Sequence, residues 1–315
     1  MHARNISICL IAFLYCLPIF SQQAETYRVP RTVYGQPDFE GIWDTQFATI
    51  LERPDGVASL VVTEDQGFTI AAELLGVIPH NEDPQFEYDG VNQLARVRGE
   101  YRSSIIVDPE NGKLPYKDSA LPLVEFESTR YQLFFDHPEQ RPLMERCLQS
   151  FGFPPIQVIP IITPYLIVQT KDDFLLFAEG SVGSRIVHLN SRRDQQAPAS
   201  HEGYSTGFWE GDTLVVETST FRADHPLRSG FGRPMLISPN TKIEERFTRL
   251  SVTELNYFFT VTDDELYTQP WSGEFSLFSN EGPIYEYACH EGNYSLPGIL
   301  RGGQLQAEEQ AVDSI

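Results

Sequence analysis

Residues 204–221 read YSTGFWEGDTLVVETSTF and carry the clearest structural signal in the chain. Two runs rich in aromatic and β-branched residues, 204–209 and 213–221, flank the tripeptide Glu210-Gly211-Asp212. Glycine in so short a connection supplies the left-handed backbone that a tight turn requires. The pattern therefore predicts a β-hairpin.

Strand-like runs of the same kind recur on both sides of this hairpin. Most are joined by short turns, and they cover residues 165–170, 174–179, 185–189, 241–250, 254–261, 275–278 and 284–289. With the hairpin, they make about nine strands. Sequential hairpins predict an antiparallel meander, which at this strand number closes into a barrel or folds into a sandwich. We expect a mainly β fold with a lipocalin-like barrel. Gly41-Ile42-Trp43 is similar to the first strand of such barrels, but any buried tryptophan after a turn would give the same pattern.

The chain divides into four predicted parts of different composition. They are a signal peptide over 1–24, a mixed α/β portion over 25–155 packed on the barrel, the barrel-like meander over 156–295 and an acidic tail over 296–315.

The mixed portion contains three predicted elements. Residues 63–77 have apolar side chains at helical spacing, a capping threonine and an acidic first turn, so we expect a helix. A short strand is expected over 103–107, and a helix over 117–135.

The first residues predict export. Arg4 precedes the apolar run Ile6–Phe20, and a polar, small-residue exit follows at 21–24. A run of about 15 residues is too short to cross a bilayer as a helix. We expect a cleaved signal, a periplasmic or secreted protein and no integral membrane span after cleavage. The alternative is an uncleaved anchor.

Composition limits the class of partner. The formal net charge is −21, from 44 acidic and 23 basic residues, which argues against nucleic acid or an anionic membrane surface. The 41% of hydrophobic residues is enough for a large core. A small-molecule ligand or substrate is the expected partner, and the oligomeric state does not follow from the sequence.

Two cysteines remain after signal cleavage, Cys147 and Cys289. Paired cysteines in an exported protein predict a disulfide. Closing so long a loop would stabilise the fold by about 4 kcal/mol.

The strand over 241–250 contains the first candidate site residue. Ile243 and Phe247 share one face, and Glu245 lies between them on that face. A carboxylate among apolar side chains must be paired, protonated or directed into a wet cavity. The alternative is a twisted or edge strand on which Glu245 is solvated.

The segment 285–294, YEYACHEGNY, contains the second. His290 stands beside Glu291, and an imidazole next to a carboxylate suits general acid–base catalysis. The competing interpretation is a rim at which these two residues and Asn293 cap backbone groups.

Other catalytic motifs are absent or out of context. The histidines have no metal-ligand spacing, and no phosphate-binding glycine-rich loop occurs. Gly203–Gly207 matches Gly-x-Ser-x-Gly, but a nucleophile elbow needs a strand before the serine and a helix after it, so Ser205 is not expected to be a nucleophile. We therefore expect neither a metal nor a cofactor.

Several segments resemble a widespread family of secreted bacterial proteins, most of which are labelled hypothetical. They are WEGDTLVVET at 209–218, ERF at 245–247, QPW at 269–271 and EYACHEGNY at 286–294. The resemblance covers roughly residues 30–305 and implies that both cysteines belong to the family pattern. It supplies no reaction.

The chain departs from that family at two places. Similar proteins carry His-Asp-Ala-Arg where this one has residues 182–185, and Asn-Leu-His where it has residues 240–242. If those histidines serve a common chemistry, this protein has lost or changed it.

The predicted function is an exported enzyme that applies acid–base chemistry, of lyase, isomerase or hydrolase type, to a small aromatic or carbohydrate-like molecule. The predicted catalytic residues are Glu245, His290 and Glu291, and the predicted substrate-binding residues are Arg185, Arg246, Trp209, Tyr287 and Asn293. The alternatives are a non-catalytic, lipocalin-type binding protein that uses the same cavity, and an extracytoplasmic interaction module.

Overall fold

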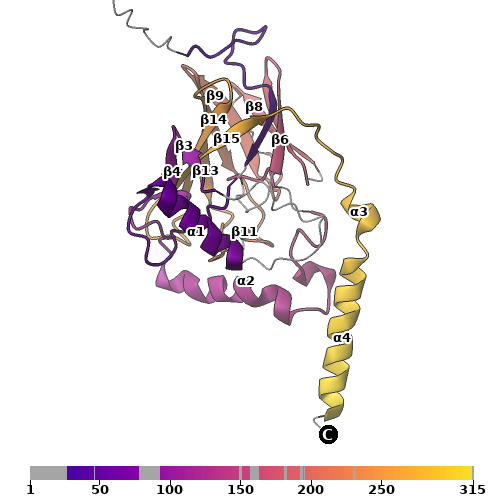
Figure 1. Ribbon diagram of the computed structural model, residues 1–315. Helices are drawn as coiled ribbons and strands as arrows, with labels where there is room; N and C mark the ends of the chain where they lie inside the picture. Colours follow the sequence, from indigo (N-terminus) through magenta and orange to yellow (C-terminus); the bar gives the residue numbers. More distant parts are fainter. Residues whose placement is uncertain are drawn as a thin grey trace, which may run out of the picture.

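A closed β-barrel dominates the computed structural model of the protein (Figure 1), which describes residues 27–45, 47–77, 93–148, 151–156, 163–180, 183–191, 194, 196–229 and 232–313. The predicted signal peptide lies outside these residues. Within them, nine strands close the barrel in the order β1-β6-β7-β8-β9-β10-β13-β14-β15, with β15 paired to β1. Their bounds are β1 Gly41–Thr45, β6 Thr163–Gln169, β7 Asp173–Ala178, β8 Ser184–Leu189, β9 Tyr204–Glu210, β10 Thr213–Ser219, β13 Lys242–Arg249, β14 Glu254–Thr262 and β15 Trp271–Asn280. The predicted fold class is confirmed.

One neighbouring pair departs from the expected antiparallel meander. Strands β8 and β9 are parallel, whereas the other neighbouring pairs of the barrel are antiparallel. A closed ring with an odd number of strands cannot alternate direction throughout, so at least one pair must be parallel. A parallel pair also needs a long crossover, and residues 190–203 provide it.

The predicted last strand, 284–289, is wrong. Residues 281–288 form no strand, and the short helix α3 (Cys289–Gly292) begins where the strand was expected to end. Strand β15 already pairs with β14 on one side and with β1 and β5 (Ile106–Asp108) on the other, so no free edge remains for a further strand. The alternating tyrosines face solvent instead, with Tyr285 66% and Tyr287 42% exposed.

The N-terminal portion contributes β1 and then a long insertion before β6. The insertion contains a three-stranded sheet in the order β2-β4-β3, two helices and two 3-10 turns. These elements are β2 Val61–Val62, α1 Glu64–Val77, β3 Arg96–Val97, β4 Glu100–Arg102, η1 Asp118–Ala120, α2 Leu121–Leu133 and η2 Pro138–Gln140. Both predicted helices are present, and the Thr63 hydroxyl accepts a hydrogen bond from the Gln66 backbone N–H (3.3 Å) to cap α1.

Large side chains from the inner faces of the strands fill the barrel. Fully buried aromatic residues of this core are Trp43, Tyr165, Phe174, Phe247, Tyr257, Phe259, Trp271 and Phe275. Gly273 makes room for one of them, because its cross-strand partner is Phe259 and a Cβ there would meet the Phe259 ring. The local fit therefore depends on the absence of a side chain.

Replacing Gly273 with alanine should lower the free energy of unfolding by about 1–3 kcal/mol, since an added methyl would displace the ring in a packed core. Urea unfolding of the purified protein measures this. Gly298, which has open space around it, is the control: its alanine variant should not lower the barrel's unfolding midpoint. Equal midpoints for Gly273→Ala and the wild type would contradict this account of the core.

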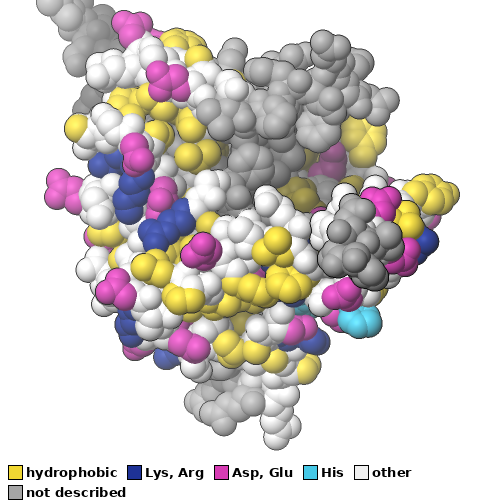
Figure 2. Space-filling view, turned by 90° about the horizontal axis from the view of Figure 1, so that it is seen from below, with side chains coloured by type: hydrophobic (Ala, Val, Ile, Leu, Met, Phe, Trp, Pro, Cys, Tyr) yellow, Lys and Arg dark blue, Asp and Glu magenta, His cyan; other side chains and the backbone are white. Residues whose placement is uncertain are grey.

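The lower part of the molecule consists mainly of helices and loops. Helix α2 lies below the barrel, and helix α4 (Ser295–Asp313) extends away from the body (Figure 1). Apolar side chains form a band across the underside (Figure 2), and the exposed ones of α2 are Leu121, Leu123, Phe126 and Leu133. No helix among the described residues has the length and apolar character needed to span a membrane.

Candidate functional site

Strand β13 directs Glu245 into the barrel, on the same face as Ile243 and Phe247, as its alternation predicts. The Glu245 side chain is 0% exposed and forms an ion pair with Arg185 of β8. The structure therefore brings together two of the predicted site residues that are 60 positions apart in the sequence.

Each polar atom of this pair has a partner. Glu245 Oε1 accepts hydrogen bonds from Arg185 Nη1 and from the Tyr257 hydroxyl, both at 2.8 Å, and Oε2 accepts one from Arg185 Nη2. Arg185 also donates to Ser205 Oγ (3.1 Å) and Thr218 Oγ1 (2.9 Å). These five side chains form a closed polar network inside an apolar barrel.

The electrostatics of the network match a structural ion pair. Burial alone would lower the pKa of Arg185, but the charge and hydrogen bonds of Glu245 outweigh it and raise that pKa above its ordinary value. Burial, and then the charge of Glu245, raise the pKa of Tyr257 well above 10. Glu245 is fully buried and both of its oxygens accept hydrogen bonds within the network, so its carboxylate is not presented to a substrate.

The structure does not bring His290 or Glu291 to this network. Both lie in α3, are exposed, and stand outside the barrel (Figure 1). Asn293 lies at the start of α4, where its side chain donates to the Glu145 carbonyl oxygen (2.8 Å) and accepts from the Leu296 N–H (3.2 Å). For Asn293 this is the capping role that the sequence left open.

Three predicted ligand contacts are also dispersed. Arg246 points outward and pairs with Glu210 and Glu244. Trp209 points inward, with its ring edge-on to Phe39 at 5.3 Å, but lies four residues along β9 from Ser205, or about 13 Å. Tyr287 lies in the exposed segment before α3.

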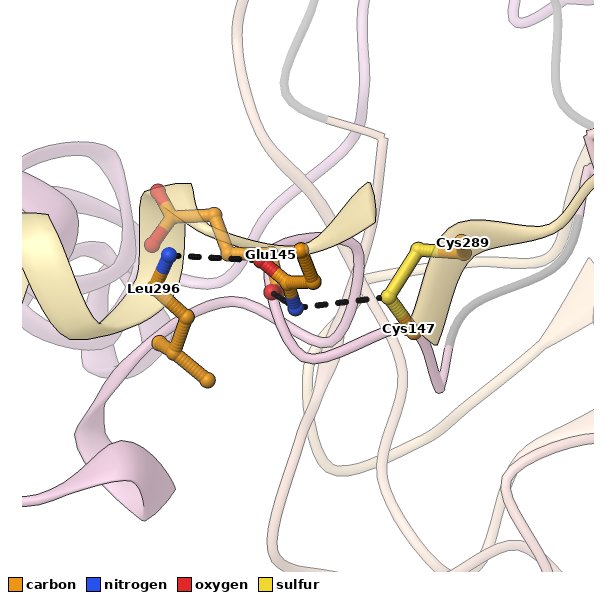
Figure 3. The surroundings of a disulfide bond; sticks show 5 residues. Glu145, Cys147, Cys289 and Leu296 are labelled. Atoms are coloured by element: carbon orange, nitrogen blue, oxygen red, sulfur yellow. Dashed lines mark hydrogen bonds between the residues drawn. A yellow bond between two sulfur atoms is a disulfide. The ribbon is translucent and has the colours of Figure 1, made fainter. Parts of the chain in front are cut away.

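The predicted disulfide is confirmed. Cys147 and Cys289 are bonded, with their Cα atoms 5.8 Å apart, and they join the insertion to the segment after the last strand. The side-chain amide of Asn293 lies 3.4 Å from Cys147 Sγ, which ties the start of α4 to the same turn (Figure 3).

A groove on the outer face of the barrel is a site that the sequence reasoning missed. It has a volume of about 420 Å³ and runs across strands β9, β10, β13 and β14. Its side chains form two cross-strand rows: Tyr204, Ser219, Lys242 and Thr262 in one, and Thr206, Glu217, Glu244 and Thr260 in the other. We call this feature the outer groove.

The charges in the outer groove are poorly compensated. Glu217 is directly opposite Glu244 in the register of β10 and β13, which places the Cβ atoms of these two acidic residues about 5 Å apart. The charge of Glu244 is partly compensated by an ion pair with Arg246 at 3.2 Å. Among the described residues, neither Glu217 nor Lys242 has an ion-pair partner within 4 Å. Both therefore remain available to a ligand.

The ring of Tyr204 stands at one end of the outer groove. It lies 5.3 Å from the His188 ring, and His188 Nδ1 lies 2.9 Å from Asp173 Oδ1. Because these contacts hold Tyr204 in place, the groove has a positioned aromatic ring at its border. In sequence, this site shows only as outward polar residues on four separate strands, and the strand register is needed to assemble them.

Comparison with protein-family models finds no match, and a search of curated proteins finds no significant similarity. The resemblance to secreted bacterial proteins therefore stays a prediction, and a function must rest on geometry. Within the described residues, no group of three or more His, Cys, Asp or Glu side chains is placed to hold a metal ion.

Proposed function

We propose that this protein is an exported, non-catalytic binding protein for a small polyhydroxylated, carbohydrate-like molecule, which it holds in the outer groove. The observation that carries the proposal is the placement of Glu217 opposite Glu244 in a groove lined mainly by hydroxyl-bearing side chains. Export rests on the predicted signal peptide.

The chemistry of the outer groove suits a ligand with many hydroxyl groups. Carboxylates accept hydrogen bonds, the Lys242 ammonium donates them, and threonine and serine hydroxyls do both. Two sugar hydroxyls can each donate to one of the two opposed carboxylates, which joins both carboxylates through the ligand. The ring of Tyr204 offers an apolar face for the C–H groups of a sugar ring.

The pairing of Glu217 with Glu244 destabilises the sheet in the absence of a ligand. Like charges directly opposite each other destabilise a sheet by up to about 1 kcal/mol. Functional sites are where such local rules are broken, because binding compensates for the lost stability. The two glutamates fit that pattern.

The positions of Glu245 and His290 favour a binding function over the predicted acid–base catalysis. The buried Glu245 is bonded through both of its oxygens, and His290 stands on an exposed helix outside the barrel. A general acid and base must both reach the same substrate within hydrogen-bonding distance or through one water. These two residues do not meet that requirement.

The test is isothermal titration of the mature protein with a panel of mono- and disaccharides. Glu217→Gln should weaken binding about tenfold, since a hydrogen bond to a charged group is worth about 1.5–3 kcal/mol. The same variant should make the free protein slightly more stable, because it removes the like-charge contact. Asp212→Asn, in the turn between β9 and β10 but outside the groove and paired with Arg31, should leave affinity unchanged.

Two outcomes decide against the proposal. One is that no saccharide binds; the other is that binding is the same in Glu217→Gln and the wild type. His290→Ala and Glu245→Gln extend the test to the enzyme alternative. Chemical turnover of a bound saccharide that disappears in either of these variants would replace binding by catalysis.

A further inference from the structure

Arg228 is a cation buried in the loops below the barrel. It lies in β11 (Leu227–Ser229), which pairs with β12 (Met235–Leu236), and its side chain is 1% exposed. The guanidinium carbon lies 5.5 Å from the centre of the Phe221 ring and 5.8 Å from that of Phe153. The cation is thus enclosed largely by apolar surface.

The partners of Arg228 are neutral. Nη2 donates to the His201 carbonyl oxygen (2.7 Å), and Nη1 donates to the carbonyl oxygens of His225 (3.2 Å) and Leu227 (3.3 Å). Across the described ranges, no carboxylate lies within 4 Å of Arg228, and its Nε has no hydrogen-bond acceptor. Burial lowers the pKa of Arg228 to about 9, which leaves it charged at neutral pH.

Two histidines and a second arginine surround this cation. The rings of His201 and His225 are 5.8 Å apart, edge to face. Arg146 Nη1 lies 2.9 Å from His225 Nε2, and because arginine only donates, this nitrogen accepts and His225 is neutral. His201 Nδ1 is buried without a partner among the described side chains.

The nearby acidic side chains interact with other arginines and not with Arg228. Asp224 is bonded to Arg222 through both oxygens (2.9 and 2.7 Å). Glu202 interacts electrostatically with Arg185, which partly offsets the rise in its pKa caused by burial. An uncompensated buried charge is costly, and an unpartnered donor beside it adds to that cost. Arg228 therefore lacks both a counter-charge and one acceptor.

We propose that Arg228 Nε and His201 Nδ1 form the two ends of a binding site for one small oxyanion group, namely a carboxylate, phosphate or sulfate. The site shares no residue with the outer groove and goes beyond the proposed function. An oxyanion supplies the missing negative charge, and its oxygens accept from the Nε–H and from an Nδ1–H of the imidazole. Arg146 adds to the positive potential at His201, because its charge lowers the pKa of that imidazole.

The site predicts proton-linked binding. Burial, then Arg130, lower the pKa of His225 to about 4, with Arg146 and His201 acting in the same direction and Asp224 opposing. For His201, burial lowers the pKa, Asp224 opposes, and Arg222, Arg228 and Arg146 add to the lowering. A bound anion favours the protonated imidazoles, so affinity should rise as the pH falls through this range.

Without a bound anion, the protein should become less stable as the pH falls. A histidine with a lowered pKa binds protons more readily in the unfolded chain than in the native state. The stability associated with His225 is therefore complete above about pH 6.5 and is lost as the pH falls toward about 4. An oxyanion should restore it.

The experiment is thermal unfolding of the mature protein at about pH 5 and about pH 7.5, with sodium phosphate, sulfate or acetate compared with chloride at equal ionic strength. At least one of the three oxyanions should raise the melting temperature more at the lower pH. Titration calorimetry should show affinity about tenfold higher there. The oxyanion that raises the melting temperature most identifies the class of anion that the site binds.

Two variants test the named donors. His201→Leu and Arg228→Met should each abolish the oxyanion-specific shift, and His201→Leu keeps the test valid if Arg228→Met does not fold. Arg31→Gln, which removes an exposed arginine paired with Asp212, should keep the whole shift. The proposal is overturned if no oxyanion exceeds chloride at either pH, or if His201→Leu responds as the wild type does.

Discussion

Glu245→Gln should lower the free energy of unfolding by about 3–5 kcal/mol, because it leaves the Arg185 guanidinium buried in the barrel without a counter-charge. The glutamine keeps the shape of the side chain, so packing is preserved and the measured loss reports the charge. Urea unfolding followed by tryptophan fluorescence measures it, and the m-value should stay constant.

The paired replacement separates the pair's net contribution from the cost of breaking it. Removing both charges with Arg185→Met and Glu245→Met should recover most of the stability, since apolar groups of similar volume suit an apolar barrel. A double-mutant cycle gives the coupling energy. A loss below about 1 kcal/mol for Glu245→Gln would show that the pair is not a structural unit and would reopen a catalytic role for Glu245.

Loss of the disulfide should have a comparable effect. Cys147 and Cys289 are 142 residues apart, so the bond restricts a long loop of the unfolded chain and should stabilise the native state by about 4–5 kcal/mol. The double variant Cys147→Ser with Cys289→Ser should unfold at a correspondingly lower urea concentration. The wild type treated with reductant should match it, and the variant itself should not respond to reductant.

The position of Cys289 offers a competing outcome. It lies in α3, after the last barrel strand, and α4 follows it. If the bond only holds this tail, its removal would make α4 sensitive to protease and leave the barrel's unfolding midpoint unchanged. Limited proteolysis beside the urea curve distinguishes the two outcomes.

The fold was largely predictable because its strands are joined by local hairpins. Each hairpin can be recognised from its own short segment of sequence, as residues 204–221 show. The predicted hairpins of the barrel are present in the structure. The error at 284–289 and the membership of β1 in the barrel have one cause. Both concern which distant strands meet to close the ring, and no local pattern encodes that closure.

The candidate site was less predictable than the fold. Alternation along β13 correctly placed Glu245 on the inner face, but its partner Arg185 lies on β8, three strands away in the sheet order. The position of Arg228 among neutral carbonyl groups was likewise invisible, because its neighbours come from separate loops. Such contacts depend on register and loop packing, which a single strand's pattern does not contain.

By itself, the sequence determined the β-rich class, the hairpins, the two helices, the inward direction of Glu245 and the pairing of Cys147 with Cys289. These follow from periodicity and turn chemistry, which act over a few residues, and from the single pair of cysteines that lies outside the predicted signal peptide. Only the tertiary structure decided that the ring closes through β1, that one pair is parallel, and that Glu217 faces Glu244. The physical reason is that side chains meet across strands according to register, and register is set by the closure of the whole barrel.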